Sequence, residues 1–383
     1  MRRKVDGSNT TSVPEKAFKM LAVSLALIAF LMLMSYGVFL WFIEPPESGV
    51  GQAQSTSLQT MHLTVNEELL LAANAGPEIV TIERLDLASG IWRNGVYSVL
   101  ILGEDDGFGG PDVIMVALLD TNERSLDVLS IPRDTMVNVP WGLKKINSIQ
   151  AYFRQLPGNH THYAEAMAQQ VGHLIGHVPQ NWITLDLGGF TNLVNAVGGV
   201  EFYVPQNMEY SDPEQDLNIN LRRGSQRLNG DQAMQLVRFR SFPQGDIARI
   251  GVQQDFMHAL AQQLLSIDGL LAIGDLIRIF EDNVDTNMSL RSLAFLAYEL
   301  LRLDGKDIRF HSVSAASANI TDHVNGISYV SLYVEPWLLL INRYMNPFTW
   351  EIIAEDLEIL TRNLSNGQLM TTNDAEIIDN WAR

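Results

Sequence analysis

The chain has 383 residues, of which 46% are hydrophobic, and its 26 basic and 44 acidic side chains give a net charge of −18. This length allows one large domain or two ordinary ones with a hydrophobic core, and the acidic balance argues against nucleic-acid binding. The absence of cysteine excludes a disulfide framework, a thiolate nucleophile and a cysteine metal site.

The first predicted element is a membrane span at residues 20–43. This stretch has no charged side chain, and at ~1.5 Å rise per residue it exceeds the ~30 Å thickness of bilayer hydrocarbon. Basic residues precede the span and acidic residues follow it, which places residues 1–19 in the cytoplasm and the bulk of the chain outside the cell membrane. A cleaved signal peptide fits less well, because no small-x-small site precedes Pro45 and Pro46. We therefore expect a retained single-pass anchor.

A spacer and a series of strands and helices are predicted next. Residues 44–94 begin with a flexible segment rich in Pro, Gly, Ser and Gln, and Leu63–Ala73 has the apolar spacing of a short helix. Beyond residue 95, apolar runs predict strands at Val99–Leu102, Val113–Leu119, Leu126–Ile131, Trp182–Leu187, Gly199–Val204 and Ile308–Val313. Helical spacing predicts helices at Asn147–Gln155, Tyr163–Ile175, Gly188–Val197, Ile247–Leu265 and Leu290–Leu303.

The order of these elements predicts the fold class. Alternating strands and helices favour a layered α-β-α sandwich around a mixed central sheet. The first three strands are apolar throughout, as expected for strands that are covered on both faces. We place this domain at residues 95–346, with its core at 97–265. Residues 347–383 form a C-terminal tail, in which the last thirty or so residues have the pattern of an acidic helix and a polar end.

Arginine is concentrated in one short stretch of the chain. The stretch contains Arg222, Arg223, Arg227, Arg238, Arg240 and Arg249. Only Asp231 and Asp246 oppose them, so the sign of the local charge is opposite to that of the whole chain. The arginine fork matches phosphate oxygens, so the cluster indicates a phosphorylated ligand. Solvated or salt-bridged surface arginines are the alternative interpretation.

Two other polar clusters follow predicted strands. Asp105 and Asp112 lie on a glycine-rich turn, where carboxylate oxygens suit Mg²⁺ or Mn²⁺, although most Asp-Gly turns serve backbone geometry alone. The second cluster is Ser130–Thr135, which contains Arg133 and Asp134. These carboxylates and the arginines would together bind a charged, phosphorylated group.

The arginine stretch has spacing that would bring its side chains together. If Arg238–Arg240 is extended, those two arginines share one face of a strand. Arg249 and Gln253 are four residues apart and share one face of the following helix. The four side chains would then hold a diphosphate from two sides.

These clusters, in this order, resemble the LytR-CpsA-Psr family of cell-wall glycopolymer ligases. The resemblance covers about Tyr97–Gln254 and continues more loosely to about Asn346. It includes Lys145–Asn147, Phe190–Val194, Val197–Val200 and Leu228–Ala233. It implies a membrane-anchored, magnesium-dependent phosphotransferase that moves a glycopolymer, such as teichoic acid or capsule, from an undecaprenyl pyrophosphate carrier to peptidoglycan as a phosphodiester.

The resemblance also implies a role for each polar residue. Asp105 and Asp112 would hold Mg²⁺ or Mn²⁺. The pyrophosphate would be bound by Arg133, Arg238, Arg240, Arg249 and Gln253. The catalytic residues would be Arg133, Asp134, Arg238 and Arg240, with Asp134 either orienting Arg133 or accepting the proton of the attacking hydroxyl. The isoprenoid tail would need an apolar tunnel between the sheet and the helices that begin near Tyr163 and Ile247, although ordinary core packing explains the same apolar faces.

The sequence departs from the family pattern at four polar positions. Gly107 and Gly110 stand where arginines are common, Val113 stands where threonine is usual, and Val252 replaces a further arginine. These changes leave two alternatives open. One is a non-catalytic sensor or scaffold that binds polyprenyl pyrophosphate, and the other is a metal-dependent pyrophosphatase.

Histidines and aromatic residues complete the candidates. His173 and His177 have the spacing of a helical metal pair, but the pattern lacks the glutamate of a zinc motif, so surface or capping roles are expected. Trp141, Tyr152 and Trp182 are candidates for stacking on sugar rings, and burial in the core is the competing explanation.

Overall fold

The computed structural model describes residues 43–46, 91–104, 110–154, 162–212, 217–239, 241–242, 246–264, 283–314, 316–362, 367–373 and 377. The predicted membrane span lies outside these residues except for Ile43, and the predicted helix at residues 63–73 lies wholly outside them. None of the helices in the described part of the chain combines the length and the apolar character that a bilayer crossing requires.

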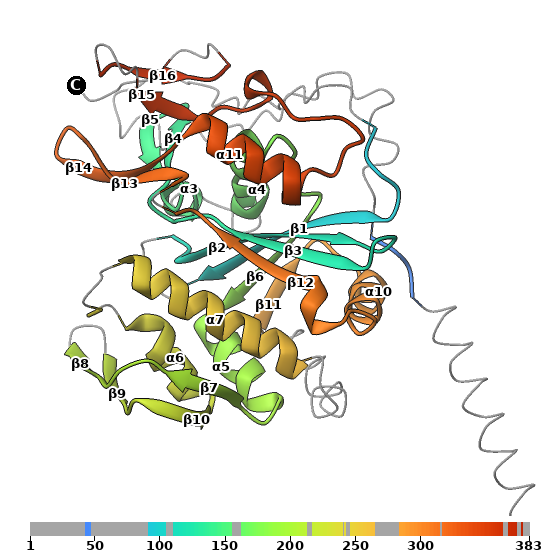
Figure 1. The fold of residues 1–383 in the computed structure, drawn as a ribbon, viewed down its shortest axis with the longest axis vertical. Helices are drawn as coiled ribbons and strands as arrows, with labels where there is room; N and C mark the ends of the chain where they lie inside the picture. The colour runs from blue at the N-terminus through green and yellow to red at the C-terminus, as the bar shows by residue number, and fades with distance from the viewer. Residues whose placement is uncertain are drawn as a thin grey trace, which may run out of the picture.

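The centre of the fold is a mixed six-stranded sheet with the order β11-β6-β1-β2-β3-β12 (Figure 1). Its strands are β1 (Val96–Glu104), β2 (Val113–Asp120), β3 (Ser125–Ser130), β6 (Asn181–Asp186), β11 (Val284–Thr286) and β12 (Ile308–Ser312). β1 is antiparallel to β2 and parallel to β6, while β12 is parallel to β3. The predicted mixed sheet is confirmed.

Strand β1 is largely apolar because both of its faces are covered. Leu100 and Leu102 belong to the core on one face of the sheet, whereas Tyr97 and Val99 belong to the core on the other face. Successive side chains of a strand point to opposite faces, so a strand that is covered on both sides favours apolar residues at consecutive positions.

One face of the sheet carries helices α3, α4 and α11, which form the upper helical layer in Figure 1. Their bounds are Ser148–Arg154, His162–Ile175 and Val334–Leu340, and α11 continues into a π-helical turn at Ile341–Met345. Met167, Val171 and Trp337 are fully buried in the shared core. Three hairpins border this layer: β4–β5 (Met136–Val139, Gly142–Lys145), β13–β14 (Ala318–Val324, Ile327–Leu332) and β15–β16 (Leu360–Arg362, Leu369–Thr371).

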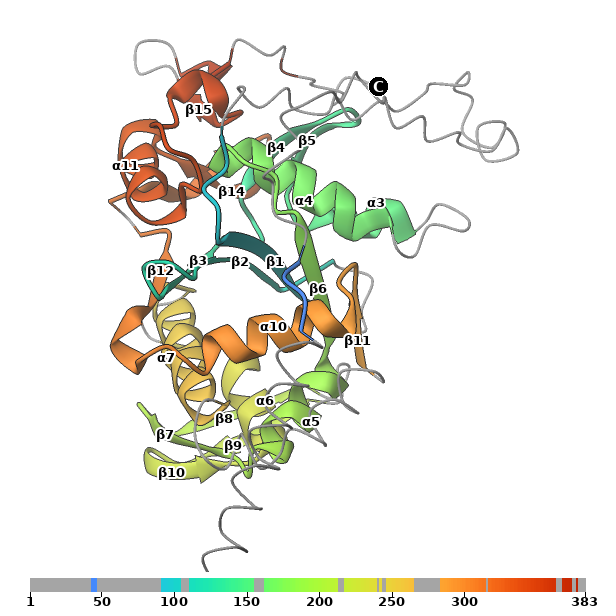
Figure 2. The same ribbon diagram turned by 90° about the vertical axis from the view of Figure 1, so that its right-hand side faces the viewer.

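The other face carries α10 (Leu290–Leu300) and a second helical group (Figure 2). That group contains α5 (Leu187–Ala196), α6 (Gly230–Arg238) and α7 (Asp246–Leu264). A separate core, which includes Val194, Leu236 and Phe256, joins these helices to the paired strands β7 (Val200–Val204) with β10 (Gly224–Leu228), and β8 (Met208–Asp212) with β9 (Leu217–Leu221). Short 3-10 turns lie at Gly305–Asp307 and Ala354–Asp356.

Strand β7 exists as predicted but lies outside the central sheet. It pairs with β10, and its Glu201 and Tyr203 are exposed while the residues at its ends are buried. A strand with one solvent-exposed face cannot lie inside a sheet that is covered by helices on both sides.

The end of the chain differs from the predicted acidic helix. In its described part, a single 3-10 turn at Ala354–Asp356 leads into the β15–β16 hairpin. Ile352, Leu357 and Ile359 are buried in the same core as the upper helices, so the fold extends beyond residue 346. Buried apolar residues at irregular spacing hold this segment, and such contacts do not produce a helical period in the sequence.

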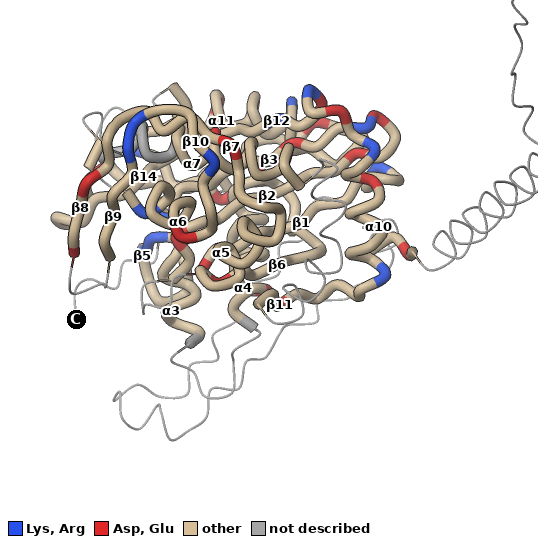
Figure 3. Tube along the Cα trace, turned by 90° about the horizontal axis from the view of Figure 1, so that it is seen from below, with Lys and Arg blue, Asp and Glu red and all other residues tan. Residues whose placement is uncertain are grey.

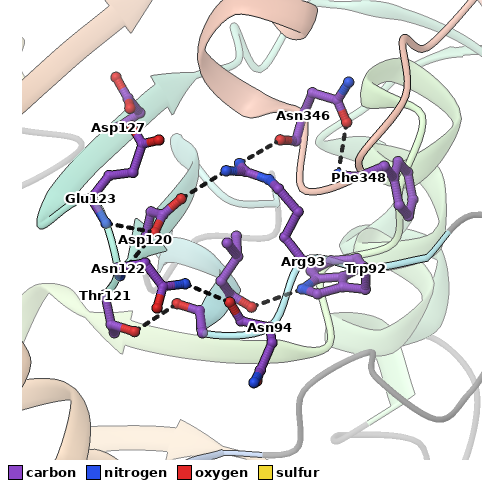
Figure 4. A network of polar contacts seen from close by, with 12 residues as sticks. Trp92, Arg93, Asn94, Asp120, Thr121, Asn122, Glu123, Asp127, Asn346 and Phe348 are labelled. Carbon is purple, nitrogen blue, oxygen red and sulfur yellow. Dashed lines mark hydrogen bonds and ion pairs between the residues drawn. The ribbon is translucent and has the colours of Figure 1, made fainter.

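A polar network around Arg93 joins three distant parts of the domain (Figure 4). The Arg93 guanidinium donates to the Asp120 carboxylate at 2.8 Å and to the main-chain oxygen of Asn346 at 3.0 Å. The Asn346 side chain accepts from the Phe348 amide at 2.8 Å. The entrance to β1, the β2–β3 turn and the chain after α11 are thereby held together.

Acidic and basic residues alternate along the end of the sheet near β12 and α10 (Figure 3). The ion pairs there include Arg309 with Asp127 at 2.6 Å and Arg302 with Glu299 at 2.8 Å. Asp127 also accepts a hydrogen bond from His311, 2.7 Å away. Burial alone would raise the pKa of Asp127, but the hydrogen bonds from His311 and Arg309 outweigh burial and hold that pKa below its ordinary value.

Candidate functional site

The site is built at the carboxyl end of β1, where the turn Gly110–Asp112 leads into β2. Gly110 has a φ of +81°, and a Cβ added there would lie 1.9 Å from the main-chain oxygen of Asn147. The main-chain amide of Asp112 donates to the main-chain oxygen of Gly103 at 3.1 Å, which fixes the backbone position of Asp112. Since only glycine permits this backbone so close to Asn147, the turn has no space for the arginine that the family often has at this position.

The structure brings together two of the predicted site residues. The guanidinium of Arg133, which follows β3, forms an ion pair with the Asp112 carboxylate. The two side chains are 29% and 40% exposed, so the pair is open to solvent and to a ligand. The Asn147 amide donates to the Arg133 oxygen at 3.2 Å. Asn147 thus contacts both the loop of Arg133 and the turn of Asp112.

Asp134 has a different partner. Its carboxylate lies 2.9 Å from the ammonium of Lys145, and its main-chain oxygen accepts from the Val330 amide at 2.9 Å. Sequence reasoning assigned no role to Lys145, although the motif Lys145–Asn147 is a signal that could have pointed to it. The Asp134–Lys145 pair fastens the loop of Arg133 to strand β5.

Arg238 and Gln253 form the second group. Arg238 is the last residue of α6, so the condition that Arg238–Arg240 is extended is not met at its first residue. Phe239 then turns extended and is buried, which ends the helix. The side-chain amide of Gln253 donates to the main-chain oxygen of Val237 at 2.8 Å. Gln253 thus fixes α7 against the residue that precedes Arg238.

Several predicted residues are not placed by the structure. Asp105 and Arg240 lie outside the described residues, and so does the side chain of Arg249. Convergence of the Asp112–Arg133 pair with the Arg238–Gln253 group on one diphosphate therefore stays a prediction. Within the described residues, no group of three His, Asp or Glu side chains is arranged to hold a metal ion.

The arginine cluster divides into two parts. Arg222 and Arg223 are exposed between β9 and β10, and Arg227 is exposed on β10. Arg227 pairs with Glu201 at 2.9 Å, and the Arg223 side chain donates to the Tyr203 hydroxyl at 3.1 Å. The partners of Arg227 and Arg223 are themselves exposed side chains, which agrees with the alternative interpretation of solvated or salt-bridged surface arginines for this half.

His173 lies in the last turn of α4, whereas His177 follows the end of that helix, and the two side chains have separate partners. His177 is fully buried, its Nε2 lies 3.0 Å from the Ser98 hydroxyl, and burial lowers its pKa to about 3. His173 pairs with Glu358 at 2.9 Å. The expected surface or capping role is wrong for His177, because a contact with β1 places it in the core.

The three aromatic candidates have separate environments. Trp182 is 5% exposed and belongs to the core, so it is closed to a sugar ring. Trp141 and Tyr152 are half-buried and stack on one another, with ring centroids 3.9 Å apart and planes 8° from parallel. This mutual stacking accounts for both residues.

A mixed sheet between helical layers, with a carboxylate and a guanidinium on the loops at one end, defines an α-β-α protein with a site suited to a phosphorylated ligand. The family model described as the LytR_cpsA_psr family matches residues 72–335, which is more than half of the chain. The chain belongs to this family.

Similar proteins support the same assignment. The chain is 29% identical over 200 residues to the regulatory protein MsrR of Staphylococcus aureus, covering 51% of this chain and 58% of MsrR. It is 29% identical over 204 residues to the Bacillus subtilis protein named polyisoprenyl-teichoic acid--peptidoglycan teichoic acid transferase TagV, covering 50% of each. The chain thus spans little more than half the length of the curated relatives that it matches.

Solved structures share the fold. The crystal structure of B. subtilis TagV aligns with a TM-score of 0.56 at 22% identity, over 68% of this chain and 100% of that one. A structure of TagT bound to LIIa-WTA aligns with a TM-score of 0.52 at 20% identity, over 67% of this chain and 92% of that one. At these identities the likeness concerns the fold.

Proposed function

We propose that the protein is a membrane-anchored phosphotransferase that moves a glycopolymer from an undecaprenyl pyrophosphate carrier to peptidoglycan. Membership of the family and the similarity to TagV, which is named as a teichoic acid transferase, support the class of reaction. The observation that carries the proposal is the solvent-open pair of Asp112 and Arg133 at the carboxyl end of β1. A carboxylate for a metal and a guanidinium for phosphate, side by side, suit a pyrophosphate substrate.

In the proposed reaction, a peptidoglycan hydroxyl attacks the phosphorus that carries the glycopolymer. A new P–O bond to peptidoglycan forms, the bridging P–O bond breaks, and its electron pair leaves with undecaprenyl phosphate. The hydroxyl proton passes to a base. Arg133, Arg238, Arg240 and Arg249 would neutralise the charge that develops on the phosphate oxygens, which is where most catalysis of phosphoryl transfer lies.

Magnesium fits the residues that are present. Mg²⁺ is usually bound by one or two carboxylates together with substrate phosphates. Asp112 offers a half-exposed carboxylate, and Asp105 would supply the second. The ion would add positive charge beside the pyrophosphate.

Asp134 is assigned the role of a positioning residue. Its neighbour Arg133 must be held at a fixed distance from the phosphate, and the ion pair of Asp134 with Lys145 restrains the loop that carries both residues. A base that accepts the hydroxyl proton is the other role open to Asp134, and an Asp134→Asn variant with an altered pH profile of transfer would favour it.

The test uses the full chain in vesicles with Mg²⁺, a lipid-linked glycopolymer donor and peptidoglycan fragments. Arg133→Ala, Arg238→Ala and Asp112→Asn should each lower the yield of linked product about 100-fold or more. The matched control is Arg227→Ala, an arginine whose partner Glu201 is exposed, which should retain transfer.

The products separate the competing functions. Linked polymer together with undecaprenyl phosphate indicates the transferase. Hydrolysis of the donor without an acceptor indicates a pyrophosphatase, and saturable binding of the donor without any product indicates a sensor or scaffold. Unchanged transfer by all three site variants would exclude the assigned site.

A further inference from the structure

The segment directly after the predicted membrane span is seated on α10. The Glu44 amide donates to the Arg291 oxygen at 3.4 Å, and the Glu44 carboxylate pairs with the Arg291 guanidinium at 3.1 Å. Pro46 is buried. Figure 2 shows this short segment beside α10. The predicted span ends at Ile43, so the very next residue, Glu44, already contacts the first turn of α10.

The outward face of α10 has an unusual composition for this chain. Leu290 is 51% exposed and Leu301, which caps the helix, is 38% exposed. Between them, Ala294 and Ala297 follow at helical spacing, and all four side chains share one face. The face is therefore apolar along the whole helix, which is ~16 Å long at the usual rise per residue.

The polar residues along this face are cationic or aromatic. Arg291 and Arg302 are 45% and 39% exposed, and the Arg302 guanidinium lies 5.4 Å from the centre of the Tyr298 ring. The one carboxylate on the helix, Glu299, is buried and paired with Arg302. In a chain with a net charge of −18, α10 itself presents leucine, alanine, tyrosine and arginine, and its own carboxylate is buried; the exposed Glu44 is paired with Arg291. This composition suits a helix at a membrane interface.

The inner face of α10 is fixed to the sheet. Leu296 is buried against Tyr97 and Val99 of β1, and the rings of Phe295 and Tyr97 pack edge to face at 5.5 Å. The helix therefore cannot leave the domain without opening this core. Whatever contacts the outer face of α10 also orients the whole domain.

We propose that the outer face of α10, from Leu290 to Leu301, lies against the headgroup region of the bilayer and sets the orientation of the domain on the membrane. This inference rests on the proposed anchor at residues 20–43. The hydrogen bond and the ion pair between Glu44 and Arg291 would hold α10 at the membrane surface. The leucines would then enter the headgroup layer, and the ion pairs of Arg291 with Glu44 and of Arg302 with Glu299 would lie at its polar surface.

The absence of cysteine allows a direct test in the natural background. Leu290→Cys and Leu301→Cys variants of the full chain, each carrying a nitroxide label, are reconstituted into phosphatidylethanolamine–phosphatidylglycerol vesicles. Power-saturation spectroscopy then compares collisions with oxygen, which enters the bilayer, and with a water-soluble nickel chelate. The matched control is Leu339→Cys, which is 72% exposed on α11, on the opposite side of the sheet (Figure 2).

The expected result is a ratio of oxygen to nickel collisions several-fold higher at positions 290 and 301 than at 339. Equal ratios at the three positions would overturn the proposal, and so would shielding of 290 and 301 from both reagents, which indicates a protein partner. Failure of the full chain to float with the vesicles would also overturn it. None of these readouts depends on polymer transfer, so they are separate from a failure of the proposed reaction.

Discussion

The turn at Gly110 gives the sharpest prediction about the site. Alanine at this position would keep a φ of +81° at a cost of about 1–2 kcal/mol. Its Cβ would also lie 1.9 Å from the Asn147 oxygen, a backbone atom that cannot rotate away. Forcing the two segments apart costs about 1–3 kcal/mol more, by analogy with overpacked cores.

Gly326→Ala is the control that separates the two effects. Gly326 has nearly the same φ, +80°, but a Cβ there would meet no atom within 4 Å. Both variants carry the backbone cost, so Gly110→Ala should lose about 1–3 kcal/mol more than Gly326→Ala. This corresponds to an additional fall of several degrees in Tm.

The assay is urea and thermal unfolding of the two variants, followed by circular dichroism. Equal losses of stability for Gly110→Ala and Gly326→Ala would refute the reasoning, because they would show that Asn147 yields without cost. Gly110→Ala should also reduce polymer transfer, since Asn147 holds the loop of Arg133.

Three further predictions concern stability. Arg93→Ala should lower the free energy of unfolding by about 1–3 kcal/mol in a urea titration, because the Asp120 carboxylate loses its charged partner. The control is Lys306→Ala, which removes an exposed ion pair and should leave the free energy of unfolding nearly unchanged. The pKa of His177 is about 3 in the folded protein and 6.5 for the free side chain, so the unfolded state binds more protons between these two values. The free energy of unfolding should therefore fall as the pH drops below about 6.5. The same pH titration of stability in His177→Gln should lack this fall. The pKa of Asp127 is held below its ordinary value, so its ionised carboxylate stabilises the fold at neutral pH and this stabilisation is lost in acid. Asp127→Asn should lower the Tm at pH 7. The difference in Tm between the variant and the unmodified chain should narrow below about pH 4 in thermal unfolding.

The central part of the fold could be predicted from the sequence because its signals are local. β1 is apolar at consecutive positions from Val99 to Leu102 because each of its faces contacts a separate core, and α4 has apolar residues at helical spacing because one stripe is buried. The family motifs mark positions of close approach. A Cβ at Gly230 would lie 2.2 Å from the Thr191 oxygen, which explains why α6 begins with glycine next to α5.

Features that depend on distant contacts could not be predicted. His173 and His177 have the spacing of a metal pair, but their actual partners, Glu358 and Ser98, are far away in the sequence. Arg238 and Arg240 alternate like strand residues, yet Arg238 belongs to a helix that is stabilised at its other end by the Asn229 capping box. Pattern alone does not show which of two local structures the packing selects.

The candidate site was predictable to the extent that it depends on motif order. Asp112 and Arg133 were expected to serve one ligand and are in contact. The role of Lys145 as the partner of Asp134 was not expected, because two oppositely charged residues on separate segments give no periodic signal.

The hydrogen bond from Arg93 to Asn346 spans 253 positions of the chain. A polypeptide emerges from the ribosome starting at its amino end, so Arg93 is made long before its acceptor exists. This hydrogen bond can therefore hold the entrance to β1 in place only after Asn346 has been synthesised. Ribosome-bound chains that stop short of Asn346 should consequently remain sensitive to proteases at the start of β1.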